Sequence, residues 1–308
     1  MRILVVGAGA IGGYFGGRLL EAGRDVTFLV RAKRAAQLAQ TGLVIKSRLG
    51  EAALNAPPTV LADDLHAPYD LVLLSCKAYD LEAAINSFAP AVGPQTAILP
   101  LLNGMRHLDV LDRRFGAHRV LGGECVIAAT LDDAGRVVHL NDTHLLAFGD
   151  RGSPASSRTD AIAAAMQAAN FASRVSDDVV LEMWEKWVFL AALAGITCLM
   201  RASVGDIVAA GGAPLALALL EECRAVAASA GYAPRAAALE QARANLTAAG
   251  STLTASMARD IERGARIEAD HVLGDMFRRG SGMIDMDRSI LRLAYTHAKA
   301  YEARLGNL

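Results

Sequence analysis

The first half of the chain alternates short apolar runs with stretches whose apolar residues have helical spacing. RILVVG (2–7) and DVTFLV (25–30) are short and rich in β-branched residues. AIGGYFGGRLLEAG (10–23) and RAKRAAQLAQTG (31–42) have the longer period of a helix. This succession predicts a βαβ unit at the N-terminus.

The alternation continues to about residue 149. Near-continuous apolar strands that alternate with helices are typical of an α/β fold with a doubly wound parallel sheet. The further strand candidates are LVIKS (43–47), DLVLLSC (70–76), TAILPLL (96–102), VLGGECVIAAT (120–130), RVVHL (136–140) and HLLAFG (144–149), with helices predicted at Tyr79–Phe88 and Met105–Phe115.

The pattern changes after Gly149. RGSPASSRTD (151–160) is polar turn material, and the rest of the chain is alanine-rich with helical spacing and no further convincing strand. We expect residues 155–170 to pack back on the sheet. The sequence therefore predicts an α/β domain over residues 1–175 and an all-helical C-terminal domain over residues 176–308.

Composition limits the classes of partner. A chain of 308 residues favours two domains. With 31 basic and 32 acidic residues, the chain has no excess positive charge that would attract nucleic acid or an anionic membrane surface. The longest apolar runs, VFLAALAGITCLM and IVAAGGAPLALALL, are shorter than the roughly 18 residues that suggest a membrane span. We expect small-molecule or protein partners, with no nucleic acid and no membrane.

The N-terminus and the cysteines indicate a cytoplasmic protein without disulfides. MRILVVGAG reaches a glycine turn where a signal peptide would still be apolar. The histidines lack the i, i+4 spacing that would place two metal ligands on one helix face. No C-x-x-C pair occurs among Cys76, Cys125, Cys198 and Cys223, which stand in apolar segments, so we expect no disulfide and no metal site.

Gly7, Gly9 and Gly12 form a G-x-G-x-x-G pattern directly after the first strand and at the start of a helix. In a Rossmann-type domain the first glycine permits a tight turn, the second lets the backbone approach a pyrophosphate, and the third allows close helix–strand packing. The phosphates lie at the helix N-terminus, so Ala10 and Ile11 join the predicted cofactor site. The alternative is a flexible glycine turn.

Arg31 occupies the end of the second strand, where NAD-specific sites usually carry an acidic residue that binds the ribose. With Lys33 and Arg34 it forms a basic cluster, and a guanidinium suits a 2′-phosphate in charge and geometry. We therefore predict NADPH (NADP) as cofactor. The alternative is a solvated basic helix start.

Lys77 in LLSCKAYD and Asn103 in LPLLNGM follow strand candidates, at the edge of the sheet where ligands bind in open α/β folds. They would place an amine and an amide where nicotinamide and substrate lie. By position alone, either could equally be an ordinary loop residue.

Lys186 stands in EMWEKWVFLAALAGITCLM, an otherwise mostly apolar helical run. Glu182 precedes it by four residues, the spacing of an ion pair on an exposed helix face. Taken alone, Lys186 reads as the solvent-facing edge of a core helix, because lysines usually lie at the surface.

Taken in order, GAGAIGG, the arginine after the second strand, CKAYD, LLNGM, MWEK and SMARDIERGARIEAD resemble the ketopantoate reductase (2-dehydropantoate 2-reductase) family, over residues 1 to about 274. The resemblance implies NADPH-dependent reduction of a 2-oxo acid in a cleft between a Rossmann domain and a helical domain, as in pantothenate and coenzyme A synthesis. It also implies a homodimer.

The resemblance assigns roles to individual residues. Lys186 aligns with the lysine that protonates the carbonyl oxygen, and Glu268 with the glutamate that contacts the substrate hydroxyl and the cofactor ribose. Ser256 aligns with the serine that holds the substrate, and Ala129 with a backbone contact to the cofactor. Without the resemblance, Glu268 and Ser256 would be taken for an ordinary helix carboxylate and an ordinary helix serine.

Three substrate positions depart from the family pattern. Leu190 and Ala194 stand where members that reduce ketopantoate carry asparagines, one and two turns after the lysine, and Leu253 replaces a polar contact before Ser256. Loss of such donors reduces selectivity for a polar substrate. Two alternatives to ketopantoate reduction therefore stay open: reduction of a less polar 2-oxo acid or related carbonyl, and a non-catalytic NADP(H)-binding sensor. The segment after Gly274 lacks the proline-containing stretch of the family, which leaves this wall of the pocket undefined.

Overall fold

The computed structural model describes residues 1–152, 155–282 and 288–306. The chain divides into two compact units: Met1–Leu102 with His107–Val179, and Asn103–Arg106 with Val180–Leu308. The main division lies between Val179 and Val180. The short segment Asn103–Arg106 departs from the expected partition, because it groups with the second unit although it lies between two elements of the first.

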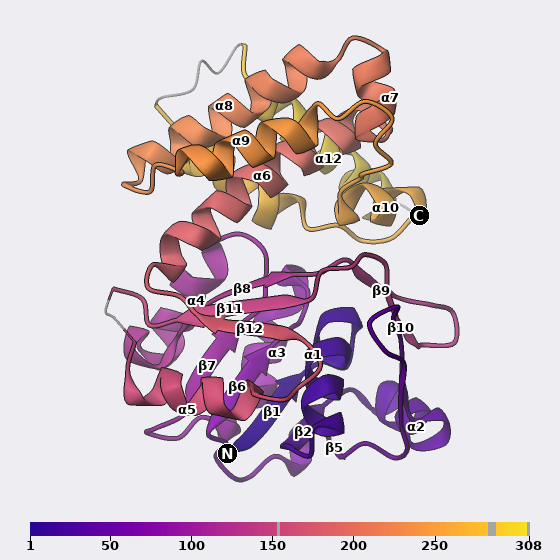
Figure 1. Ribbon diagram of the computed structural model, residues 1–308, viewed down its shortest axis with the longest axis vertical. Coiled ribbons are helices and arrows are strands. Elements are labelled where there is room, and N and C mark those ends of the chain that lie inside the picture. The colour runs from indigo at the N-terminus through magenta and orange to yellow at the C-terminus, as the bar shows by residue number, and fades with distance from the viewer. Residues whose placement is uncertain (153–154, 283–287, 307–308) are drawn as a thin grey trace. The chain divides into compact units, whose positions relative to one another are not determined.

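The first unit contains the predicted doubly wound sheet, five parallel strands in the order β5-β2-β1-β6-β7 (Figure 1). β1 pairs with β2 on one side and β6 on the other, so the strand order reverses beside β1. Ligands of open α/β sheets bind at this point, beyond the carboxyl ends of the strands. The strands are β1 (Arg2–Val6), β2 (Asp25–Leu29), β5 (Thr59–Val60), β6 (Leu71–Leu74) and β7 (Ala97–Pro100).

The other strands of this unit form two smaller sheets, with the orders β4-β3-β10-β9 and β12-β11-β8. Their members are β3 (Leu43–Lys46), β4 (Ala52–Leu54), β8 (Gly122–Val126), β9 (Ala129–Leu131), β10 (Val137–His139), β11 (Leu145–Gly149) and β12 (Ala172–Val175).

β12 corrects the expectation that no strand follows Gly149. Its four residues, ASRV, alternate between exposed and half-buried, and it pairs in parallel with β11. Such a short and polar edge strand is held by backbone pairing with its neighbour, so its side chains carry little hydrophobic signal.

Glycines let α1 (Ala10–Glu21) pack closely between two sheets. A Cβ at Gly16 would lie 2.7 Å from the Phe28 ring in the parallel sheet, and one at Gly13 would lie 2.9 Å from Val137 in the second sheet. Side chains at these positions would force the layers apart, which explains the run AIGGYFGG in a buried helix.

The remaining helices of this unit follow the sequence prediction. α5 packs on the sheet layer as expected, with Ile162 and Met166 in the hydrophobic core. Residues 153 and 154 of the predicted polar turn lie outside the described part of the chain. The helices are α2 (Ala32–Thr41), α3 (Leu81–Phe88), α4 (Arg106–Phe115) and α5 (Ser157–Met166), with short 3₁₀ turns at Ala62–Asp64, Ala78–Asp80, Ala89–Ala91 and Ala117–Arg119.

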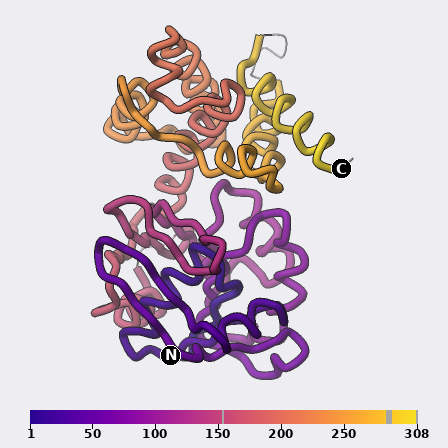
Figure 2. Tube along the Cα trace, turned by 90° about the vertical axis from the view of Figure 1, so that its right-hand side faces the viewer, coloured from indigo at the N-terminus to yellow at the C-terminus, as the bar shows by residue number. Residues whose placement is uncertain are grey.

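From Val180 on, the second unit is helical in its described residues, which run from rose through orange to yellow in Figure 2. Much of α6 is buried, including its residues Trp184 and Trp187 and the run from Ala191 to Cys198. This burial raises the pKa of the Cys198 thiol to about 12. Glu222 caps α12 by accepting the Ile290 N–H at 2.8 Å. The helices are α6 (Val179–Met200), α7 (Val204–Ala209), α8 (Ala213–Ser229), α9 (Ala236–Leu246), α10 (Ser256–Glu262), a π-helical turn at Asp270–Gly274, α11 (Asp275–Arg279) and α12 (Ile290–Gly306).

Among the described residues, no helix has the length and apolar character needed to cross a membrane.

Candidate active site

The glycine turn after β1 combines a left-handed backbone conformation, one tight packing contact and one open position. Gly7 has a φ of +93°, a backbone conformation that favours glycine, and its N–H donates to the Leu29 carbonyl at 2.9 Å. A Cβ at Gly12 would lie 2.1 Å from the Gly7 carbonyl oxygen, whereas one at Gly9 would meet nothing within 4 Å. Gly12 is therefore required for packing, and Gly9 leaves open space where a ligand could approach the backbone.

The N-terminus of α1 is suited to an anion. Gly9 is the N-cap, no side chain caps the helix, and the first turn contains no acidic residue. The first amides of a helix have no intrahelical acceptor and carry the positive end of the helix dipole. The N–H groups of Ala10, Ile11 and Gly12 belong to this first turn, so the turn could bind a pyrophosphate.

Ser75 supports this turn and was not predicted from the sequence. It follows β6, and its Oγ lies 2.9 Å from the Val6 carbonyl oxygen and 3.2 Å from that of Gly7, so its hydroxyl donates at the end of β1. The available signal was its place as the first polar residue after a buried strand.

Arg31 is the N-cap of α2, and its side chain is 77% exposed. Its Nη2 lies 3.0 Å from Oδ1 of Asp80, which follows β6 and was also missed by sequence reasoning. Arg34 has a structural role, because its Nε donates to the Ala8 carbonyl at 3.1 Å and burial lowers the pKa of its guanidinium. Within the predicted basic cluster, Arg31 and Lys33 are exposed and Arg34 is half-buried.

Lys77 and Ala129 also lie in the first unit. Lys77 is exposed after β6, and its carbonyl accepts the Asp80 N–H at 2.9 Å. Ala129 begins β9 opposite His139, and Oδ1 of Asn141 accepts the N–H of the preceding Ala128 at 2.9 Å. The backbone at Ala129 is thus held by pairing and by a side-chain hydrogen bond.

Lys186 lies on α6 in the second unit and is half-buried. Glu182 and Leu190, one turn before and after, are also half-buried, and Ala194 is only 4% exposed. The neighbouring Trp187 is fully buried, and its indole N–H donates to the Val272 carbonyl at 3.0 Å.

Asn103 and Glu268 are in the same unit as Lys186. Asn103 is half-buried and precedes Gly104, which has a φ of +78° and packs against the backbone and imidazole of His271. Glu268 is half-buried, and its carbonyl accepts the N–H of His271 at 3.1 Å and that of Val272 at 3.0 Å. His271 and Val272 therefore connect the Asn103 turn, the Glu268 backbone and the α6 segment next to Lys186.

Ser256 is exposed at the first position of α10. The preceding Ala255 N–H lies 3.4 Å from Oγ1 of Thr197 on α6, which places the start of α10 beside the later turns of that helix. Leu253 is 36% exposed. The segment after Gly274, which the sequence left undefined as a wall of the pocket, contains α11. Residues 283–287 of this segment lie outside the described part of the chain.

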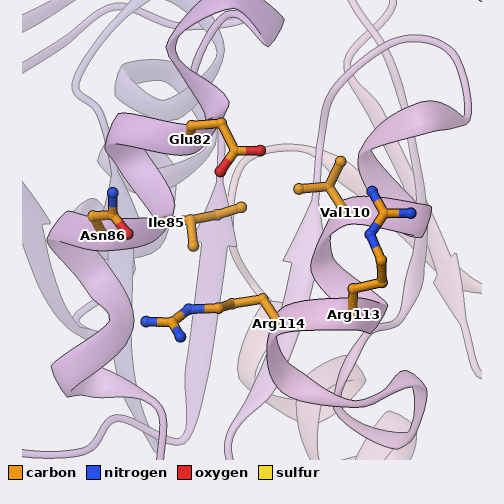
Figure 3. Close-up of a pocket in the computed structure, with 6 residues that line it drawn as sticks. All are labelled: Glu82, Ile85, Asn86, Val110, Arg113 and Arg114. Atoms are coloured by element: carbon orange, nitrogen blue, oxygen red, sulfur yellow. The ribbon is translucent and has the colours of Figure 1, made fainter.

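A surface pocket of about 240 Å³ lies between α3 and α4, and none of the predicted site residues lines it (Figure 3). Glu82, Ile85 and Asn86 line it from α3, and Val110, Arg113 and Arg114 from α4. The predicted chemistry does not use this pocket. Among the described residues, no group of three or more His, Cys, Asp or Glu side chains could hold a metal.

Two family models match the chain. "Ketopantoate reductase PanE/ApbA" matches residues 3–152, and "Ketopantoate reductase PanE/ApbA C terminal" matches residues 178–302. The uncharacterized oxidoreductase YkpB of Bacillus subtilis is 35% identical over 304 residues, which cover 98% of this chain and 99% of that protein.

Two further relatives are also similar over nearly their full length. The 2-dehydropantoate 2-reductase of Archaeoglobus fulgidus is 29% identical, with 95% of this chain and 96% of that protein covered. The crystal structure of a PanE/ApbA family ketopantoate reductase from Ralstonia eutropha JMP134 has a TM-score of 0.88 and 25% identity, and the match covers 99% of this chain and 100% of that one.

Proposed function

Because the chain belongs to the ketopantoate reductase family, a family of oxidoreductases that act on CH–OH groups, we propose that it reduces a 2-oxo acid to a 2-hydroxy acid with NADPH. The nominal substrate is 2-dehydropantoate, and the product would then be pantoate. A homodimer is the expected assembly, to be measured by light scattering after size-exclusion chromatography.

The observation that carries this proposal is the connected set in the second unit. Trp187 next to Lys186 binds the Val272 carbonyl, and the adjoining His271 packs on Gly104 next to Asn103. Glu268 precedes this turn and accepts hydrogen bonds from it. An ammonium, an amide and a carboxylate are the groups needed to protonate an alkoxide, orient a carbonyl and bind the resulting hydroxyl.

The first unit fits a dinucleotide. The open space at Gly9, the packed Gly12 and the uncapped start of α1 suit a pyrophosphate, and Arg31 suits a 2′-phosphate. When bound, NADPH supplies the hydride. Lys77 and the Ala129 backbone would orient the nicotinamide half, and Lys186 would give its proton to the carbonyl oxygen.

The residues at the predicted substrate positions favour a substrate that is less polar than ketopantoate. Leu190 and Ala194 present no hydrogen-bond donor on the α6 face that follows Lys186, and Leu253 presents none before Ser256. A site that lacks these donors loses discrimination in favour of a polar hydroxylated acid. Reduction of a more apolar 2-oxo acid is therefore the second candidate for the same machinery.

A panel of 2-oxo acids with graded side-chain polarity, followed by NADPH absorbance, tests the proposal. We expect turnover with at least one acid and faster oxidation of NADPH than of NADH. Tight NADPH binding without turnover across the panel would overturn the reductase proposal and leave a cofactor-binding sensor.

Leu190→Asn should shift selectivity toward ketopantoate by about tenfold in the ratio of kcat/KM values, because one added donor can bind its hydroxyl. Ala194→Asn is then added in a second step, since Ala194 is 4% exposed and a larger side chain there risks overpacking. Leu190→Ala is the matched control, because it removes the apolar side chain without adding an amide. If wild type already prefers ketopantoate strongly, the interpretation of these positions is wrong.

A further inference from the structure

His271 is a buried titratable residue to which the proposed reaction assigns no role. It is 6% exposed and lies in the π-helical turn Asp270–Gly274, three residues after Glu268. π-Helical turns are rare, and they often occur at functional sites.

The imidazole contacts the Asn103–Gly104 turn directly. A ring N–H donates to the backbone carbonyl of Asn103. A Cβ built on Gly104 would lie 3.3 Å from Cδ2 and 3.4 Å from Nε2 of His271, so the ring packs against the glycine α-carbon. The φ of +78° at Gly104 gives this turn a conformation that a side chain would strain, and the packed ring leaves little room for one.

The backbone around His271 reaches the other two candidate residues. Its N–H donates to the Glu268 carbonyl at 3.1 Å, and the carbonyl of the next residue, Val272, accepts the Trp187 indole at 3.0 Å. Since Trp187 directly follows Lys186, two consecutive residues connect all three segments.

Burial favours the neutral form of the His271 ring and outweighs the acidic groups around it. Burial lowers the pKa of His271 most strongly, while Glu268, the Asn103 carbonyl and Asp275 raise it and Arg106 lowers it further. The net direction is downward, so the imidazole is neutral at and above neutral pH and donates from one ring nitrogen.

We propose that His271 is a positioning residue that fixes the Asn103 turn relative to Glu268 and Lys186, through its hydrogen bond to the Asn103 carbonyl and its packing on Gly104. This inference rests on the proposed function, because it assumes that Asn103 orients the reacting carbonyl. Asn103 bears the amide, and His271 acts through it without touching the substrate.

The test compares His271→Leu, which keeps an apolar volume but loses the donor, with His271→Gln, which retains an N–H donor. We expect His271→Leu to lower kcat by about 10- to 100-fold, the range for a lost buried hydrogen bond that leaves an acceptor unsatisfied. The KM should change by less than about threefold on the same argument, because the substrate loses no direct contact. His271→Gln should recover at least a third of the wild-type kcat.

His297→Leu is the matched control, a half-buried histidine on α12 in the same unit, and it should leave kcat unchanged. Should His271→Leu fail to fold, Gly104→Ala disturbs the same contact from the opposite side and should also lower kcat. Equal losses in the Leu and Gln variants, or no loss in either, would overturn the role of the donor.

Hydrogen–deuterium exchange separates this inference from the proposed function. Peptides that cover residues 101–108 should exchange faster in His271→Leu than in wild type, and at wild-type rates in His271→Gln and His297→Leu. This measurement needs no turnover, so it gives a result even if every 2-oxo acid proves inert. Unchanged exchange in His271→Leu would show that His271 does not hold the turn.

Discussion

Replacement of Lys186 by alanine should lower kcat by about 10²–10⁴-fold, the usual size of lost acid catalysis, while NADPH affinity barely changes. Hydride transfer leaves an alkoxide, and this substitution removes the ammonium that we propose to protonate it. Lys186→Arg should not rescue the rate, because a guanidinium keeps the charge but is a poor proton donor near neutral pH. Single-turnover hydride transfer and NADPH binding, measured on the same variants, separate chemistry from cofactor affinity.

Arg224→Ala is a matched control for this experiment. Arg224 pairs with Glu221 on an exposed face of α8 in the same unit, so its loss should leave kcat unchanged and have only a small effect on stability. If Lys186 were merely a partner of Glu182, Lys186→Ala would behave like this control. A Lys186→Ala enzyme that keeps more than about a tenth of wild-type turnover would remove the lysine from the proposed chemistry.

Arg31→Asp should weaken NADPH binding by about 10²-fold and change NADH binding far less. The substitution removes a charge-assisted contact to the 2′-phosphate and adds a repelling carboxylate, whereas a free ribose hydroxyl can still donate to that carboxylate. Titration of both dinucleotides by fluorescence gives the ratio of dissociation constants. Equal losses for the two cofactors would show that Arg31 does not bind the 2′-phosphate.

Two neighbouring variants sharpen this result. Lys33→Asp changes the charge by the same amount at an exposed residue of the same helix. A smaller loss of NADPH affinity in Lys33→Asp than in Arg31→Asp would show that Arg31 acts through its position and not only through its charge. Asp80→Asn removes the carboxylate that lies 3.0 Å from the Arg31 guanidinium. If Arg31 binds the 2′-phosphate as proposed, that carboxylate would compete with the phosphate, and its removal should strengthen NADPH binding by about two- to fivefold, as for other exposed ion pairs.

The sequence predicted most elements of the parallel sheet because their signals are local. β1, β6 and β7 are buried along almost their whole length and appear as continuous apolar runs, and the glycine pattern marks the first turn. The division of the strands into three sheets was not predictable in this way. β3 and β10 are short, mostly apolar runs like the central strands, and only their long-range partners place them in a separate sheet.

The residues of the candidate site also fall into those that the sequence could predict and those that it could not. Gly7, Asn103 and Lys186 could be chosen because each follows or interrupts a regular apolar pattern. Asp80 and His271 carry no such signal, and Ser75 carries only its place after a buried strand, because the roles of all three depend on contacts with residues 49 or more positions away in the chain. A single sequence does not encode such pairings in a form that local patterns reveal.

The grouping of Asn103–Arg106 with the helical unit has a consequence for protein engineering. A hybrid enzyme made by joining the first 179 residues of one relative to the helical region of another would keep Lys186 with Glu268 and His271. It would take Asn103 and Gly104 from the other parent, so the imidazole would meet a turn that evolved with a different partner. An exchange of substrate preference between relatives therefore needs two crossovers, one at each side of residues 103–106, in addition to the one near residue 179.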